Sequence, residues 1–320
     1  MNGLRLVGKK VLYLIPVLFA VTLLSFLLIK LLPGDPAIDI LGPSATPSAV
    51  QDLHHQLGLD KPLASQYLRW LSQAATGDLG RSYQNQQTTL SALKQRLPIT
   101  LELIILSQLL ALSLAIPVAL LAASKPGGIL DRVSTTVAFG FLAVPDFILG
   151  VLLVFVFAVK LRWFPATGYT PLTANPLANL KSLVLPVVTL AMASVAVYLR
   201  LLRTDLIATL QQDYISMAKA KGLPNSFIMF RHALRPSSFS LITVSGLQFG
   251  ALIGGTFIIE IIFALPGVGS LAVQSIFSRD YLVVQGTVLL IAVAYVLVNF
   301  AIDLLYTALD PRIRHAGALS

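Results

Sequence analysis

The sequence predicts an all-α membrane protein with six transmembrane helices. Of its 320 residues 56% are apolar, only 12% are charged, and the apolar residues form continuous runs rather than alternating with polar ones. A soluble domain carries about twice that charged fraction. Continuous runs favour spanning helices over the alternating strands of a membrane barrel. We therefore expect a single transmembrane domain over residues 1–320.

Six apolar runs approach or reach the roughly 20 residues that a helix needs to cross a bilayer. The first ends before Leu32-Pro33-Gly34-Asp35 without the small-residue cleavage site of a signal peptide, so we expect it to be retained. The fourth is short and must extend into flanking residues. The last contains Asp303, for which a structural role near the inner face is expected. The runs are Val11–Ile29, Leu103–Ala123, Val133–Val159, Val184–Leu199, Phe239–Ile259 and Gly286–Leu309.

The distribution of Lys and Arg predicts the orientation. With the N-terminus inside, thirteen of the 23 basic residues lie in the shorter inner segments, and ten are spread over longer outer loops. Under the positive-inside rule, both termini are then cytoplasmic. The net charge of +9 follows from this topology and from anionic lipid, so no nucleic-acid partner is indicated.

The loop between the first two runs is predicted to be a large external segment, residues 33–98, with its own short helices. One helix is expected over Pro47–Leu57 with Thr46 as its cap, and another over Leu63–Ala75. His54 and His55 are adjacent and point in different directions, so they are interpreted as surface residues rather than as a metal pair.

The composition also excludes several kinds of chemistry. The chain contains no cysteine, which excludes disulfides and thiolate sites. It contains no G-x-x-x-x-G-K-[ST] run, so no phosphate-binding loop for ATP is present. We see no nucleophile–base pair or metal set, and the chain is not expected to be an enzyme. Energy for any transport must come from a partner or from an ion gradient.

The polar, basic segment 213–236 lies on the predicted cytoplasmic side and is typical of a helix, a turn and a second helix. Asp213 is expected to cap the first helix, and Gly222 to end it in the left-handed conformation. Ser226 is expected to cap the second helix, which Pro236 should end. The alternative is an ordinary cytoplasmic loop with well-defined helix signals.

Within this segment Ala218 and Gly222 are small and lie four residues apart. They predict a face on which another protein approaches the backbone closely. Ser216-Met217-Ala218 with Gly222 four residues on resembles the EAA motif of ABC importer permeases.

Further motifs resemble the dipeptide, oligopeptide and nickel branch of that family, and together they cover nearly the whole chain. Each motif alone is weak, but their order and spacing are specific. They are Leu32–Pro36, Leu57–Pro62, Gly77–Ser82, Pro145–Phe147, Ala218–Leu223, Arg231–Arg235, Pro266–Gly269, Arg279–Tyr281 and Leu309–Arg312.

The resemblance implies a type I ABC importer permease fold in a bacterial or archaeal cytoplasmic membrane. It implies a second homologous permease, two ABC ATPase subunits that bind ATP and Mg, and an extracytoplasmic solute-binding protein. This chain would bind no cofactor and would form half of a path for peptides or similar small solutes by alternating access. The alternative is a self-sufficient secondary transporter or channel that uses intramembrane carboxylates.

The resemblance also assigns residues to ATPase docking. Ser216 stands where the general motif has an acidic residue, so docking is expected to depend on shape rather than on a salt bridge. The general Leu-Pro pair is spread out here as Leu234-Arg235-Pro236. The predicted docking residues are Tyr214, Ser216, Met217, Ala218, Lys221, Gly222, Arg231 and His232.

Two further sets of residues have alternative interpretations. Asp146 and Glu260 are ionisable residues in or beside membrane runs, where charge is costly. We expect them either to line or gate the translocation path, or to be structural, as a buried helix–helix hydrogen bond or an interfacial carboxylate. Gly250 and Gly254 form a small-xxx-small face, which packs within the chain or against the second permease.

Overall fold

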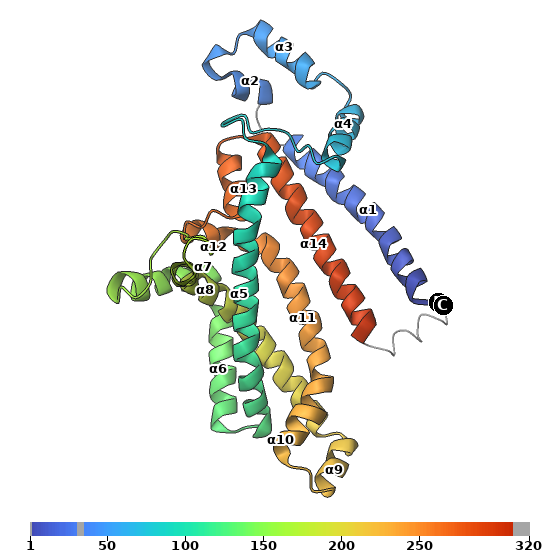
Figure 1. The fold of residues 1–320 in the computed structure, drawn as a ribbon, viewed down its shortest axis with the longest axis vertical. Helices are drawn as coiled ribbons and strands as arrows, with labels where there is room; N and C mark the ends of the chain where they lie inside the picture. Colours follow the sequence, from blue (N-terminus) through green and yellow to red (C-terminus); the bar gives the residue numbers. More distant parts are fainter. Residues whose placement is uncertain (1, 31–34, 310–320) are drawn as a thin grey trace. The chain divides into compact units, whose positions relative to one another are not determined.

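The computed structural model describes residues 2–30 and 35–309, which contain helices and turns and no strand (Figure 1). The chain forms two compact units, each built from two separate stretches. The first unit combines residues 1–100 with 266–297, and the second combines 101–265 with 298–320. Helices α5 (Thr89–Ser124) and α14 (Tyr281–Leu309) each begin in the first unit and end in the second.

The first unit is held partly by aromatic packing between α1 and α4. Phe26, Tyr67 and Trp70 are buried together, and the hydroxyls of Tyr67 and Thr22 lie 2.8 Å apart in a hydrogen bond. Besides the starts of α5 and α14, this unit contains α1 (Asn2–Lys30), α2 (Pro36–Leu41), the 3₁₀ turn η1 (Gly42–Ser44), α3 (Pro47–Leu57), α4 (Leu63–Ala75) and α13 (Val268–Phe277).

The two helices predicted between the first runs are confirmed with the same bounds. The Thr46 hydroxyl accepts a hydrogen bond from the Ala49 amide and so caps α3. His54 Nε2 lies 2.8 Å from Asp35 Oδ1 and joins α3 to the start of α2. Burial opposes ionisation of Asp35, but hydrogen bonds from His54 and Ala37 outweigh it and lower the pKa of the Asp35 carboxyl. His55 is exposed, and its Nδ1 lies 2.9 Å from Asp60 Oδ2.

A buried carboxylate joins two distant parts of the first unit. Asp280 accepts hydrogen bonds from the Ser82 hydroxyl and from the Tyr83 amide. The Gln84 side chain also donates to the Ser278 carbonyl at 3.1 Å. Segments almost two hundred residues apart are therefore connected where two of the motifs, Gly77–Ser82 and Arg279–Tyr281, meet.

The second unit is organised around α8 (Pro176–Leu210), against which α6, α7 and α11 pack. The helix exceeds the predicted run Val184–Leu199 at both ends, as the short run required. The other elements of this unit are α6 (Ile129–Ala143), α7 (Asp146–Leu153), the π turn η2 (Val154–Lys160), α9 (Asp213–Ala220), α10 (Asn225–Phe227), the π turn η3 (Ile228–Ala233), α11 (Leu234–Gly255) and α12 (Phe257–Ile262).

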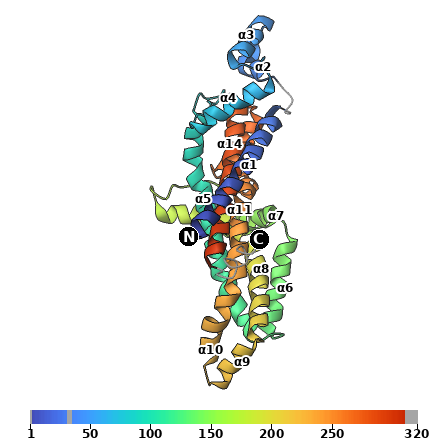
Figure 2. The same cartoon turned by 90° about the vertical axis from the view of Figure 1, so that its right-hand side faces the viewer.

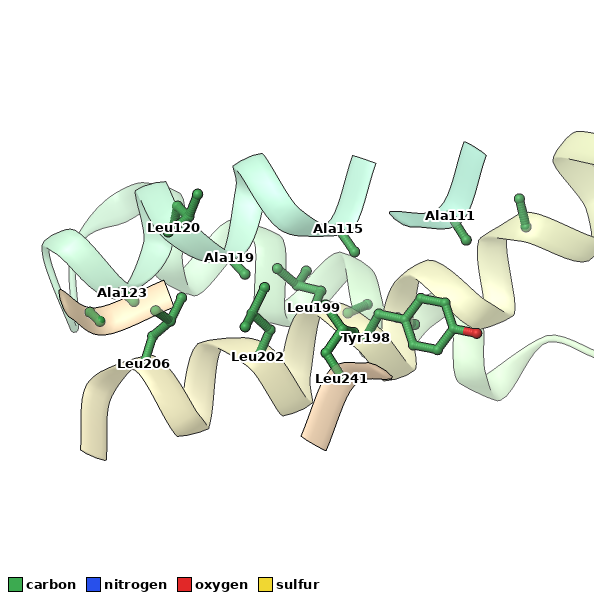
Figure 3. Close-up of a cluster of buried hydrophobic side chains, with 14 residues drawn as sticks. Ala111, Ala115, Ala119, Leu120, Ala123, Tyr198, Leu199, Leu202, Leu206 and Leu241 are labelled. Carbon is green, nitrogen blue, oxygen red and sulfur yellow. The ribbon is translucent and has the colours of Figure 1, made fainter. Parts of the chain in front are cut away.

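Small residues allow α5 to lie close to α8. Alanines recur every four residues along α5, and all four belong to one buried cluster with leucines of α8 (Figure 3). Close backbone approach through small side chains is typical of helix pairs in membranes, where van der Waals contact replaces the hydrophobic effect. The facing residues are Ala111, Ala115, Ala119 and Ala123 on α5, and Leu199, Leu202 and Leu206 on α8.

An ion pair fixes the start of α6 to α8. The Arg203 guanidinium donates through Nε and Nη2 to both oxygens of Asp131, whose side chain is almost completely buried. Asp131 also accepts a hydrogen bond from the Gly127 amide at 2.8 Å. All three groups therefore stabilise the turn that connects α5 with α6.

Not every predicted run forms one continuous membrane-length helix. In the described residues, four helices are long and apolar enough to cross a membrane, or five if a bent helix pair forms one span. The bent pair is the third run: α6 and α7 meet at 101° where Val144 is extended and Pro145 follows. Proline cannot donate the backbone hydrogen bond that would continue the helix. The third run is therefore a bent pair of helices rather than one straight helix.

Three further runs differ in detail. The fifth run is interrupted at Thr256, where α11 ends and α12 begins. The first run lies in α1, of which the described apolar part, Leu14–Leu27, is shorter than a membrane span. The sixth run lies in α14, and the side chain of Asp303 falls outside the described residues.

Candidate functional site

The segment 213–236 folds as a compact turn between α8 and α11, at the end of the second unit where α9 and α10 lie (Figure 2). Its first helix, α9, begins at Asp213, and the residue at its N-cap is Gln212, which makes no side-chain capping bond. The predicted Asp213 cap is therefore wrong by one position. Asp213 instead places its carboxylate in the first turn, where the helix dipole favours negative charge.

The predicted end of α9 at Gly222 is confirmed. Gly222 has φ +76°, in the left-handed region that glycine tolerates best. Its amide donates to the Lys219 carbonyl at 2.9 Å, and the Leu223 amide donates to the Ala218 carbonyl at 3.3 Å. These two bonds form a Schellman motif, which satisfies the last carbonyls of the helix and reverses the chain.

A small apolar cluster holds the turn together. Ile215 and Ile228 are fully buried against each other, with Leu210 and Leu223 packed around them. Ala218 belongs to the same cluster and is only 7% exposed. The prediction that Ala218 presents a face to another protein is therefore wrong, because its methyl group packs inside the turn.

The outer face of the turn consists of other residues of the predicted set. Tyr214 is 45% exposed and Met217 is 60% exposed. Together with Lys221, which is also exposed, they are spaced at i, i+3 and i+7 along one helical face. Ser216 and Gly222 are exposed as well, and a Cβ added at Gly222 would meet no other atom within 4 Å.

The second helix of the turn does not end at Pro236. Residues 225–255 form one helix that passes through the π turn η3, so α10 continues into α11. Pro236 lies three residues after the end of this wide turn, and the change in hydrogen-bond register there leaves room for a ring that an α-helix would exclude. Ser226 makes no capping bond, since Pro224 occupies the N-cap.

Arg231 and His232 lie on the π turn itself. Arg231 is exposed, whereas His232 is half-buried with its ring edge against Phe227 at 5.5 Å between centroids. The predicted set omitted Phe227, the last residue of α10, whose side chain is exposed. An aromatic residue inside a polar segment is the sequence signal that would have identified it.

Asp146 and Glu260 occupy different environments. Asp146 is half-buried at the start of α7, where the helix pair bends, and its role in a path stays a prediction. Glu260 is 0% exposed and accepts a hydrogen bond from the Thr256 hydroxyl at 3.0 Å. In this conformation Glu260 therefore fits the structural alternative rather than a lining of the path.

The two glycines of the small-residue face also differ. Gly250 is buried within the unit, which fits the intrachain alternative, whereas Gly254 is exposed near the end of α11. In the described part of the chain, no group of three or more His, Asp or Glu residues could hold a metal ion.

Comparisons with known families match both halves of the chain. Residues 115–315 match the family described as "Binding-protein-dependent transport system inner membrane component". Residues 3–104 match "Binding-prot-dependent transport system membrane comp, N-term". The longer match contains the α9–α10 turn and α11.

Individual relatives are similar over almost their whole length. A Brucella abortus (strain 2308) protein, named as a peptide transport system permease, is 41% identical over 310 residues, covering 97% of this chain and 99% of that protein. The glutathione transport system permease protein GsiC of Escherichia coli (strain K12) is 37% identical over 312 residues, covering 98% and 99%. An inward-facing structure of the MetNI methionine ABC transporter shares the fold, with a TM-score of 0.57, 18% identity, and coverage of 68% of this chain and 96% of that chain.

Proposed function

Because the chain belongs to the family of binding-protein-dependent ABC transport permeases, we propose that the α9–α10 turn is the surface on which ATPase subunits dock. The chain is a non-catalytic permease subunit with several membrane-length helices. The observation that supports the proposal is an exposed apolar stripe, Tyr214 and Met217, on a turn whose own core is complete. Exposed apolar residues on a rigid projection are typical of protein interfaces.

The turn is suited to transmit movement. It is joined to α8 on one side, and on the other it continues through η3 into α11 without a break in the helix. The Thr209 and Ser237 hydroxyls, 3.0 Å apart, connect α8 and α11 just behind it. A force applied to α9 is therefore transmitted to two membrane-length helices at once.

The proposed assembly follows the family. Two ATPases bind ATP and Mg, a second homologous permease completes the path, and an extracytoplasmic protein delivers the solute. The six spans would be α1, α5, the bent pair α6–η2, α8, the helix 225–255 and α14, with both termini and the α9–α10 turn cytoplasmic and residues 33–98 outside. The names of the relatives favour peptides or glutathione-like molecules as the solute. Gly254 and the exposed end of α11 are available to the second permease.

The docking surface comprises Tyr214, Ser216, Met217, Lys221 and Gly222 in this proposal, with Arg231 and His232 at its edge. Ala218 acts indirectly, since it supports the stripe from inside the turn. A secondary transporter that uses Glu260 has little support, because this carboxylate is buried and hydrogen-bonded to Thr256.

The test is ATP-driven uptake by the assembled importer in proteoliposomes. Met217→Asp places a charge in the apolar stripe, so we expect uptake to fall more than tenfold while the protein elutes as the wild type does. Ser124→Asp adds the same charge at the exposed end of α5, outside the stripe, and should leave uptake unchanged. Equal uptake by Met217→Asp and the wild type would contradict the docking surface. Uptake by the chain alone down an ion gradient would support the secondary transporter instead.

A further inference from the structure

Helix α4 belongs to the segment proposed to lie outside, but it packs against two helices that are proposed to cross the membrane. Its Tyr67 and Trp70 are buried with Phe26 of α1, and Leu289 of α14 packs against the same cluster. Phe26 lies within the apolar run of α1, and Leu289 lies eight residues after the start of α14. Eight residues of helix correspond to about 12 Å. These contacts place one face of α4 within the depth of both apolar runs.

The ring of Tyr67 shows that α4 crosses α1 instead of running beside it. It meets the rings of both Phe19 and Phe26, with centroids 5.9 and 5.6 Å away. These phenylalanines are separated by about 10 Å along the axis of α1. One residue of α4 therefore contacts two turns of α1. With 13 residues, α4 is also too short to span a bilayer itself.

The polar atoms of this contact are satisfied inside the protein. The Thr22 hydroxyl donates to the Phe19 carbonyl at 2.9 Å, so it accepts the hydrogen of the Tyr67 hydroxyl, which lies 2.8 Å away. Tyr67 is 5% exposed, and Thr22 is 7% exposed. Because lipid tails offer no hydrogen-bond partner, polar groups at membrane depth must be paired in this way. The contact is therefore compatible with a surrounding of hydrocarbon.

The two flanks of α4 beside this contact differ in polarity. One flank carries apolar residues at i, i+4, i+7 and i+11, and its Leu68 is 62% exposed. The opposite flank carries polar residues at i, i+3 and i+7. Residues at these spacings share one side of a helix. The apolar flank consists of Ala64, Leu68, Leu71 and Ala75, and the polar flank of Gln66, Arg69 and Gln73.

The polar flank faces the rest of the outer segment. The Gln66 amide donates to the carbonyls of Leu59 and Lys61 at 3.0 and 2.7 Å. Arg69 reaches the end of α3, where a Cβ added at Gly58 would come within 2.7 Å of its Nη1. The apolar flank is therefore turned away from the connection between α3 and α4.

We propose that α4 is an interfacial helix whose apolar flank packs against lipid acyl chains of the outer leaflet. Leu24, in the part of α1 that α4 crosses, is 59% exposed, so lipid is already expected at this depth. Acyl chains on one side and water on the other require a helix with one apolar and one polar flank. A second permease covering α4 would not require this division. The inference goes beyond transport and rests on the proposed membrane placement of α1.

The test is the accessibility of nitroxide labels in the complete importer, assembled with cysteine-free partner subunits in vesicles of phosphatidylcholine and phosphatidylglycerol. The chain contains no cysteine, so each introduced thiol reports one position. Oxygen concentrates among acyl chains, whereas a nickel chelate stays in water. We expect the ratio of oxygen to nickel access to be at least about threefold higher at Leu68→Cys than at Gln73→Cys. Leu24→Cys on α1 is the lipid-facing control and should resemble Leu68→Cys.

Two results at Leu68→Cys would overturn the inference. Low access of both reagents would mean that a protein surface covers the flank. Nickel access equal to that at Gln73→Cys would mean that α4 lies in water. If Leu68→Cys fails to fold, Ala75→Cys on the same flank decides by the same criteria.

Two further measurements separate this inference from the proposed function. If the nickel chelate reaches Leu24→Cys, the membrane placement of α1 fails, and the inference fails with it. ATP-driven uptake is measured in the same vesicles. Normal uptake together with a water-exposed Leu68→Cys overturns only the interfacial helix and leaves ATPase docking intact.

Discussion

Helices α8 and α11 belong to the same unit and are both long enough to cross a membrane, but they are buried to very different degrees. In the apolar 18-residue stretch of α8, 67% is buried inside the chain. In the corresponding stretch of the helix that contains α11, only 11% is buried. Lipid is as apolar as leucine, so exposure of apolar side chains in a bilayer carries no hydrophobic penalty. Burial therefore identifies α8 as the helix that holds the fold, and its absence identifies α11 as the helix available for other contacts.

The polar groups of the two helices follow the same division. Arg203 and Tyr198 of α8 are bonded to side chains on α6 and α5. Thr243 and Ser245 of α11 donate instead to the Phe239 and Ile242 carbonyls of their own helix. The second unit thus separates a structural helix from one that carries the proposed permease contacts.

The largest expected effect concerns the ion pair of α8. Arg203→Met leaves the buried Asp131 carboxylate without its partner, which should destabilise the protein by about 3–5 kcal/mol. Arg200→Met on the exposed face of the same helix is the matched control and should have little effect. Thermal denaturation followed by size-exclusion chromatography measures both. Recovery of stability in the double variant Asp131→Asn with Arg203→Met would sharpen the interpretation, and a stable single variant would contradict it.

The next test compares one residue type on the two helices. Leu202 of α8 is fully buried against the alanines of α5, whereas Leu247 of α11 is half exposed. Leu202→Ala should cost at least about 2 kcal/mol because it leaves a cavity. Leu247→Ala should cost much less, since lipid replaces the lost side chain. Equal losses of thermal stability in detergent would break the comparison between the helices.

A smaller effect is expected at Thr256, the residue directly after α11, which makes a buried polar contact. Thr256→Val removes the hydroxyl that donates to Glu260 and should cost about 1–3 kcal/mol. Thr204→Val on α8 is the control, because its exposed hydroxyl bonds only to the Arg200 carbonyl in its own helix. The same denaturation measurement applies. An unchanged Thr256→Val protein would show that Glu260 does not depend on this bond.

Much of the helical architecture could be predicted from the sequence because apolar runs and turn residues act locally. Thr46 capped α3 as predicted, and Gly222 ended α9 through its left-handed conformation. Pro145 removes a backbone hydrogen bond from the third run, but the 101° size of the bend there could not be predicted. The passage of the helix through Pro236 could not be predicted either, since it depends on the π turn that precedes the proline.

The candidate site was predicted as a segment but not by its exposed face. Ala218 and Gly222 share a small size, which says nothing about which side of the turn each faces. Only the packing of Ile215 against Ile228 decides that Ala218 is internal and that Met217 is external. Likewise, the pairing of Gln108 with Tyr198 joins residues ninety positions apart and leaves no local pattern.

The central claim is that the Tyr214–Met217 stripe contacts an ATPase. The chain contains no cysteine, so one introduced thiol reports one position. We expect Met217→Cys in the assembled importer to cross-link to a single-cysteine ATPase subunit through a short bismaleimide, and Ala218→Cys, one residue away but buried, to cross-link much less. Cross-linking from Ala218→Cys and none from Met217→Cys, at any ATPase position scanned, would contradict the account.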